Sequence, residues 1–155
     1  MSLISSHCGI NVLGMEYPGY GLYTGNGDAS AAKIQQDAEY VYKYVLQECG
    51  LQEDDIIIFG RSMGSGPASF LAGNYNPAAL CLMSAYTSVK AVAGDVVGWL
   101  SFLVQQRFNN LEMVKKATCP TFILHGRQDE VIPFHHGKSL SEQSRGIPVV
   151  FEDRG

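Results

Sequence analysis

Short apolar runs alternate with more polar stretches along almost the whole chain, and this alternation constrains the fold more than any other feature. Short runs rich in β-branched residues are typical of strands buried in a parallel sheet. When such strands alternate with helices, the expected product is a parallel sheet with helices on both faces. We therefore predict an α/β fold with a mostly parallel sheet. The expected strands occupy residues 10–15, 56–59, 79–83, 121–124 and 148–151.

The segment between the first two runs predicts a helix. Either Asp28 or Ser30 is the expected N-cap, and Gly50 stands where a glycine commonly follows a helix end. A further helix is expected to begin near Met63. The apolar residues of the first helix recur at helical spacing: Ile34, Ala38, Val41, Tyr42 and Val45.

Composition favours one domain that spans residues 1–155. Hydrophobic residues make up 46% and charged residues 17%, which suffices for a packed core. A net charge of -4 with scattered Lys and Arg argues against nucleic acid as a partner. The oligomeric state stays open.

The cysteines and the apolar runs bear on location. The four cysteines include no CxxC pair, which argues against a zinc site and a disulfide framework and favours reduced thiols in the cytoplasm. No signal peptide is apparent at the start, and the longest apolar run, 96–104, falls far short of the roughly 20 residues of a membrane span. The cysteines are Cys8, Cys49, Cys81 and Cys119.

The pentapeptide Gly60–Gly64 reads G-R-S-M-G and carries the predicted chemistry. A serine among glycines often marks only a turn. This one directly follows an expected strand and precedes an expected helix, the context of a nucleophile elbow. We predict Ser62 as the nucleophile and the backbone N–H of Met63 as an oxyanion-hole donor. Gly60 and Gly64 are expected to avoid clashes in the strained turn.

Asp129 is the best candidate for the acid that orients a catalytic histidine. It follows the expected strand 121–124, in a loop that opens at the same edge of the sheet as Ser62. In the fold that a nucleophile elbow indicates, the acid comes after the serine and before the histidine along the chain. The alternative is an ordinary loop carboxylate or helix cap, with Glu130 as a second candidate facing solvent.

Four stretches together resemble the α/β-hydrolase family, in particular its small cytosolic branch that includes protein depalmitoylases. This resemblance implies a serine hydrolase of carboxylic esters or thioesters, working through a Ser-His-Asp triad and an acyl-enzyme intermediate. It implies no metal or organic cofactor, and a small-molecule or acylated-protein ester as substrate. The stretches are Glu16–Gly21, Gly60–Gly66, Ser84–Ser88 and His125–Ile132.

Two departures from the family pattern indicate a partial domain. The family has strands, and a His-Gly loop with a second oxyanion donor, before the position of residue 10. Its histidine follows the last core strand, so here it is expected just after Gly155. Two alternatives stay open: a peptidase-type hydrolase on the same fold, and a non-catalytic scaffold or interaction protein. The internal histidines are expected to be structural or solvent-facing: His7, His125, His135 and His136.

The stretch between Tyr86 and Lys116 is unusually apolar and does not alternate. One hypothesis is a roof that accepts an acyl chain or rests on a membrane surface, which would make the protein membrane-associated. The equally weighted alternative is that these side chains cover the sheet. Candidate substrate-binding residues are Tyr17, Tyr86 and Trp99.

Overall fold

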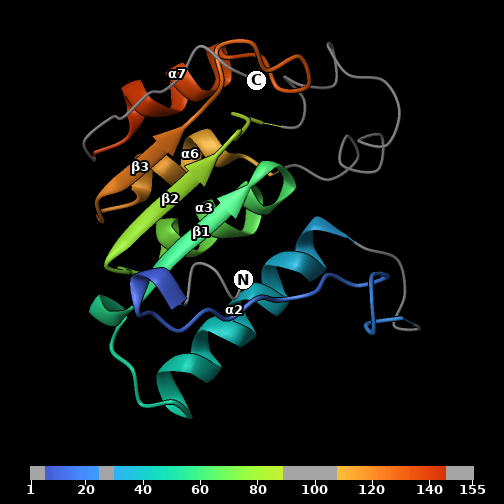
Figure 1. Ribbon diagram of the computed structural model, residues 1–155, viewed down its shortest axis with the longest axis vertical. Coiled ribbons are helices and arrows are strands. Elements are labelled where there is room, and N and C mark those ends of the chain that lie inside the picture. Colours follow the sequence, from blue (N-terminus) through green and yellow to red (C-terminus); the bar gives the residue numbers. More distant parts are fainter. Residues whose placement is uncertain (1–5, 25–29, 89–107, 146–155) are drawn as a thin grey trace.

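A three-stranded parallel sheet forms the centre of the structure (Figure 1), a computed structural model that describes residues 6–24, 30–88 and 108–145. The strands are β1 (Ile57–Arg61), β2 (Ala79–Met83) and β3 (Thr121–Leu124), in the order β1-β2-β3. The predictions for 79–83 and 121–124 are confirmed to the residue, and β1 lies slightly later than the predicted 56–59. The predicted strand 148–151 lies outside the described residues.

Each connection between strands carries a helix, as the alternation predicted. The helix α2 (Ala31–Gln47) precedes β1, α3 (Ser65–Asn74) joins β1 to β2, α6 (Asn110–Lys116) lies before β3, and α7 (His135–Gln143) follows it. Two short 3₁₀ turns, η1 (Glu53–Asp55) and η2 (Ser62–Gly64), flank β1.

The ends of α2 agree with the sequence prediction. Ser30 is its N-cap, since the Ser30 hydroxyl accepts a hydrogen bond from the Lys33 amide at 3.1 Å. Such a bond satisfies one of the amides that a helix start leaves unpaired. Gly50, just past the helix end, has φ +69°, a left-handed conformation that costs glycine little.

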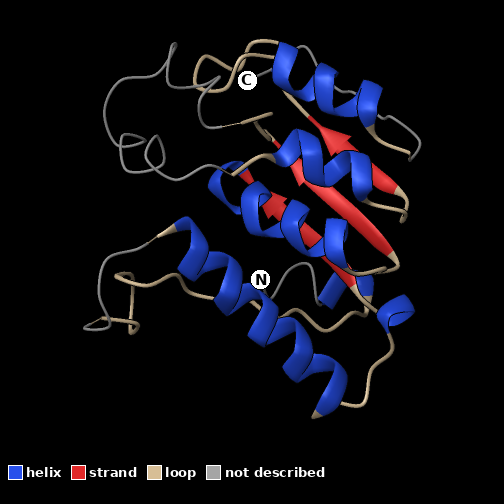
Figure 2. Cartoon of the chain, turned by 180° about the vertical axis from the view of Figure 1, so that it is seen from behind, coloured by secondary structure: helices blue, strands red, loops and turns tan. Residues whose placement is uncertain are grey.

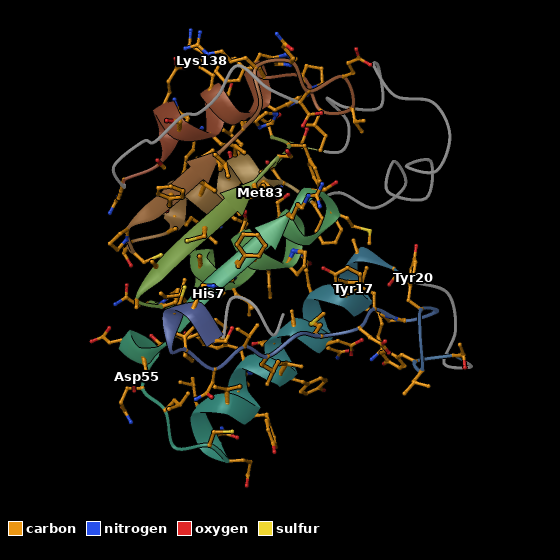
Figure 3. All side chains as sticks on the ribbon, viewed as in Figure 1. His7, Tyr17, Tyr20, Asp55, Met83 and Lys138 are labelled. Atoms are coloured by element: carbon orange, nitrogen blue, oxygen red, sulfur yellow. The ribbon has the colours of Figure 1, made fainter. Side chains whose placement is uncertain are left out.

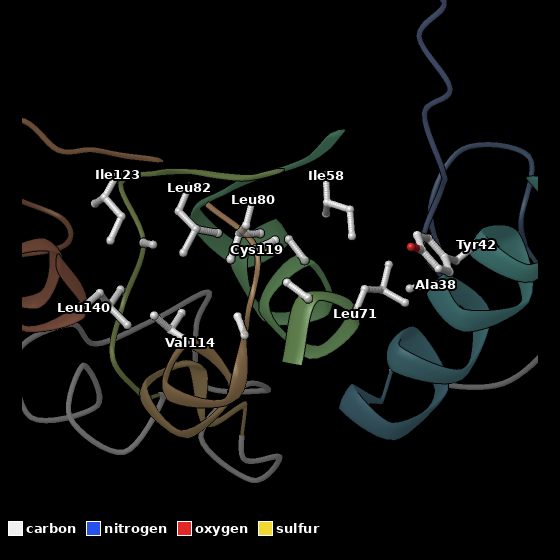
Figure 4. Close-up of a cluster of buried hydrophobic side chains, with 14 residues drawn as sticks. Ala38, Tyr42, Ile58, Leu71, Leu80, Leu82, Val114, Cys119, Ile123 and Leu140 are labelled. Atoms are coloured by element: carbon white, nitrogen blue, oxygen red, sulfur yellow. The ribbon is translucent and has the colours of Figure 1, made fainter. Parts of the chain in front are cut away.

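The main core lies between the sheet and the described helices. Alternate strand residues, among them Ile58, Leu80 and Ile123, point to one face and are buried. Against them pack side chains from all four helices: Tyr42, Leu71, Val114 and Leu140 (Figure 4). Seen from behind, α3 and α6 lie in front of the strands (Figure 2).

The opposite face of the sheet carries exposed apolar side chains. Ile57 is 60% exposed, Phe59 62% and Phe122 43%. Phe59, Cys81 and Phe122 lie side by side in one register row, and Met83 projects from this face (Figure 3). The parallel α/β arrangement is confirmed, and α2, α3, α6 and α7 all contribute to the core on one face. The expectation of a buried strand over 56–59 holds for one face only within the described residues, because Ile57 and Phe59 are exposed.

Residues 10–15 do not form the predicted strand. Their backbone has no regular structure, and Leu13 is 58% exposed. An extended apolar run becomes a strand only when a neighbour pairs with its backbone N–H and C=O groups. Across residues 6–24, 30–88 and 108–145, the sheet contains no partner for this run.

Candidate active site

The sheet register brings the predicted site residues to one edge. Arg61, Met83 and Leu124 pair across the three strands as their last residues. The next residues, Ser62 and Ser84, therefore leave the sheet beside each other, and the loop that contains Asp129 starts one strand further on. Strands of equal direction end at a common edge, which is where open α/β sheets bind ligands.

Ser62 occupies a strained turn between β1 and α3. Its φ is +48°, in the left-handed region that residues with a Cβ rarely adopt. Gly60 makes the turn possible, because a Cβ there would lie 2.5 Å from the Gly64 carbonyl oxygen and 2.6 Å from the Ala68 Cβ. Among the described residues, a Cβ on Gly64 would meet only the Tyr17 hydroxyl, at 3.3 Å. The expected strain and the need for Gly60 are confirmed, whereas Gly64 is under a weaker constraint.

Ser84 shares the unusual backbone of Ser62. With φ +45° it is the second non-glycine residue of positive φ within the described ranges. Its amide donates to the Leu124 carbonyl at 2.9 Å, so the left-handed residue still continues the pairing of β2 with β3. Strained residues cluster at functional sites. Ser84 was not predicted as a site residue, because Met83 and Ala85 flank it and the glycines that mark the turn at Ser62 are missing there.

Asp129 is held by the loop that contains it. Its Oδ1 accepts the amides of Val131 at 3.0 Å and of Ile132 at 2.8 Å. Partial burial raises the pKa of Asp129, but hydrogen bonds from the Ile132 amide and the Ser84 side chain outweigh it and leave the pKa below its ordinary value. Glu130 is exposed, as predicted.

Two described histidines are built into the core. The buried His125 donates from Nε2 to the Ile132 carbonyl at 2.7 Å, and this nitrogen lies 3.8 Å from Asp129 Oδ2. The buried His136 contacts the Thr87 hydroxyl through Nδ1 at 2.9 Å. His7 and His135 are exposed. These positions agree with the structural and solvent-facing roles expected of all four.

A second apolar cluster includes one predicted site residue, and two more pack against it. Tyr17, beside α2 in Figure 3, and Met63 pack against it half-buried. Tyr86 is a member of the cluster and only 3% exposed, so its side chain lies in the core. Burial raises the pKa of both tyrosines. Trp99 lies outside the described residues.

Phe108 is the last residue of the apolar stretch for which the sequence suggested an acyl-binding roof. Its ring is buried and lies where a Cβ on Gly66 would be, 2.6 Å from the nearest ring atom. At this position the stretch covers α3. The rest of it, residues 89–107, lies outside the described residues.

The described residues offer neither a metal site nor a membrane-spanning helix. In residues 6–24, 30–88 and 108–145, no three His, Cys, Asp or Glu side chains are grouped to bind a metal ion. Over the same ranges, no helix has both the length and the apolar character to cross a bilayer.

A profile of the phospholipase/carboxylesterase family matches residues 1–147. The chain belongs to this family of α/β hydrolases. It is 34% identical to the α/β hydrolase domain-containing protein aho-3 of Caenorhabditis elegans, over 88% of this chain and 40% of that protein. It is 33% identical to the α/β hydrolase domain-containing protein 17B of Homo sapiens, over 90% of this chain and 47% of that protein. The chain thus spans less than half the length of these relatives.

Solved structures support the same fold. An acetyl xylan esterase from Paenibacillus sp. R4 superposes with a TM-score of 0.66 at 15% identity, over 90% of this chain and 54% of that one. A puromycin-hydrolyzing peptidase of Mycobacterium tuberculosis superposes with a TM-score of 0.65 at 13% identity, over 79% of this chain and 22% of that one. At such identities the likeness concerns the fold alone.

Proposed function

We propose that this chain carries the nucleophile and the acid of a serine hydrolase that cleaves carboxylic esters or thioesters through an acyl-enzyme intermediate. The observation that carries the proposal is the left-handed backbone of Ser62 at the end of β1. Left-handed backbone costs a residue with a Cβ roughly 1–2 kcal/mol, and a glycine would avoid that cost. A catalytic role for the Ser62 hydroxyl explains why serine, and not glycine, occupies this position.

The register of the sheet, which brings the ends of β1 and β3 to one edge, supports the following mechanism. The Ser62 hydroxyl attacks the acyl carbonyl and gives its proton to the histidine of the triad, which follows the acid along the chain in this fold. Asp129 holds that histidine in the required orientation. The N–H of Met63 then stabilises the oxyanion of the tetrahedral intermediate, and water releases the acyl group from Ser62 with the histidine again as base.

The substrate side of the proposal rests on apolar surroundings. Tyr17 and Met63 are half-buried and pack against an apolar cluster, and Met63 directly follows the nucleophile. Such surroundings favour binding of an acyl group over binding of a sugar or a charged group. We place the protein in the cytoplasm, with an acylated protein or a lipid-like ester as the substrate class and a membrane surface as a peripheral contact. The four free cysteines agree with this location.

The decisive experiment is labelling of the natural protein with a fluorophosphonate probe, followed by intact mass measurement. One adduct is expected on the wild type and none on Ser62→Ala. Ser69→Ala, which removes another buried serine hydroxyl from α3, is the matched control and should label normally. If the wild type takes up no probe, the catalytic proposal is wrong and a scaffold or interaction protein becomes the better interpretation.

A second assay separates the two kinds of hydrolase. Similar solved structures include peptidases as well as esterases. Hydrolysis of acyl esters and acyl thioesters of increasing chain length is compared with hydrolysis of aminoacyl amides. Ester cleavage at a rate that increases with acyl chain length supports the proposal. A rate that does not depend on chain length contradicts the hypothesis of an acyl-binding roof. Amide cleavage at a comparable rate favours a peptidase.

A further inference from the structure

A row of buried polar groups runs beneath the nucleophile elbow. The Ser65 hydroxyl donates to the Ser62 carbonyl oxygen at 2.6 Å. The side-chain nitrogen of Asn110 donates to the Ser65 hydroxyl oxygen at 2.9 Å and to the Tyr86 carbonyl oxygen at 2.9 Å. Ser65 is 0% exposed and Asn110 1%. These groups are withdrawn from water, so leaving them unpaired would cost about 1–3 kcal/mol each.

The direction of each hydrogen bond follows from the chemistry of the groups. A backbone carbonyl can only accept, so the Asn110 side chain must present its nitrogen to Tyr86. The two N–H groups of that nitrogen are then used, one toward Tyr86 and one toward Ser65. Ser65 therefore accepts from Asn110 and has its own O–H left for Ser62. From Asn110 through Ser65, each side chain thus donates a hydrogen bond toward Ser62, and the last one ends on the Ser62 carbonyl. We call this pair of hydrogen bonds the relay.

The Ser62 carbonyl belongs to the same peptide group as the N–H of Met63. A peptide group is planar and trans, so its C=O and N–H point in opposite directions and turn as one body. The Ser62 carbonyl also accepts the backbone N–H of Ser65, which fixes it from the side of α3. Holding the carbonyl toward the buried relay therefore holds the Met63 N–H away from it. A carbonyl that accepts hydrogen bonds also polarises its peptide and strengthens the N–H as a donor.

We propose that Asn110 and Ser65 are positioning residues that aim and strengthen the Met63 amide as the oxyanion-hole donor. This inference rests on the proposed function and deepens it. Neither residue touches the substrate. Their effect reaches the reaction through one rigid peptide group, and it acts on the charge that develops in the transition state more than on the bound ground state.

The test compares three variants of the natural protein. Asn110→Asp keeps the size of the side chain but removes both N–H donors, Ser65→Ala removes the last link, and Ser69→Ala is the matched control. The Ser69 side chain is 0% exposed in the same helix, and its hydroxyl makes no hydrogen bond among the described residues.

For Asn110→Asp and Ser65→Ala, kcat is expected to fall about 10-fold with KM unchanged, less than the 10²–10³-fold loss of a whole oxyanion donor. Binding of a boronic acid that mimics the tetrahedral intermediate should weaken by the same factor. The ¹H shift of the Met63 amide should move upfield as its polarisation falls. Ser69→Ala should leave all three unchanged.

Other outcomes would overturn the relay. If Ser65→Ala loses kcat no more than Ser69→Ala, or if kcat and the boronic acid affinity change independently, the inference is wrong. Ser65→Ala carries the test alone if the buried carboxylate of Asn110→Asp prevents folding. An active wild type labelled at Ser62, with relay variants that are equally active, would leave the proposed function intact and reject only the relay.

Discussion

The nucleophile elbow after β1 and the acid loop after β3 lie at the same edge of one sheet, but different forces hold them. The elbow is held by close steric packing. The atoms around Gly60 leave no room for a methyl group, and the ring of Phe108 fills the space over Gly66. The acid loop is held by hydrogen bonds to a charged group, because the Asp129 carboxylate accepts the backbone amides of Val131 and Ile132. Shape therefore controls the first half of the site and electrostatics the second.

This difference implies different responses to change. A steric constraint acts equally at every pH and fails abruptly when an atom is added. An electrostatic constraint weakens as the carboxylate takes up a proton. The predictions below test this contrast.

The largest effect is expected for Asp129→Asn in the natural protein. An amide cannot stabilise the charged histidine that forms during the reaction, so kcat should fall by about 10⁴-fold. Steady-state kinetics at neutral pH measures it. A loss below 10-fold would mean that Asp129 only shapes its loop, the alternative raised from the sequence.

Gly60→Ala should cost about 3 kcal/mol of unfolding free energy, because the new methyl group meets backbone on one side and Ala68 on the other. Gly64→Ala is the matched control and should cost about 1 kcal/mol or less, since its one close neighbour in the described part of the chain is the Tyr17 hydroxyl. Urea denaturation measures both, and equal costs would contradict the steric account. The difference between wild type and Gly60→Ala should not vary with pH.

Stability that depends on Asp129 should vary with pH. The pKa of Asp129 is lowered from 3.8 in the folded protein, so the carboxylate stabilises the fold above that value. This contribution disappears as the pH falls through the folded pKa. Between pH 6 and roughly pH 2, the wild type should therefore lose more stability than Asp129→Asn. Parallel curves for the two proteins would show that the carboxylate contributes no net charge stabilisation.

The smallest effect is expected at Ser84. Ser84→Ala keeps the strained backbone and loses the hydrogen bond to Asp129, so it should cost about 1 kcal/mol. Ser84→Gly loses the same bond but relieves the backbone, so its stability should be close to that of the wild type. Both should raise the pKa of Asp129, measured by NMR titration of its carboxyl carbon. An unchanged pKa of Asp129 in both variants would show that the Ser84 side chain does not lower it.

The same contrast explains what the sequence could predict. Residues 79–83 and 121–124 were predicted to the residue because each is a short, mostly apolar run that ends at a polar residue, Ser84 or His125. The elbow was predictable because its steric requirement selects glycine. The position of Asp129 followed from chain order, but its interaction with Ser84 did not, since the two residues are distant in sequence.

Two kinds of feature could not be predicted. Residues 10–15 have the composition of a strand, yet a strand also needs a neighbour with which to pair, and composition does not reveal one. The role of Asn110 was also missed. A single asparagine at a helix start usually suggests a cap or a turn, and only the folded chain shows that it reaches Ser65 and Tyr86.

The ring of His125 lies where a side chain on Gly137 would begin: a Cβ there would lie 2.5 Å from Nδ1. The missing methyl group thus sets how closely α7 approaches the end of β3. The two positions share one volume, so during evolution neither can change freely alone. Among related sequences, a larger residue at position 137 should occur together with a smaller one at position 125, and the same exchange should link positions 66 and 108. Such correlated substitutions would leave a record of this packing in sequences whose structures have never been determined.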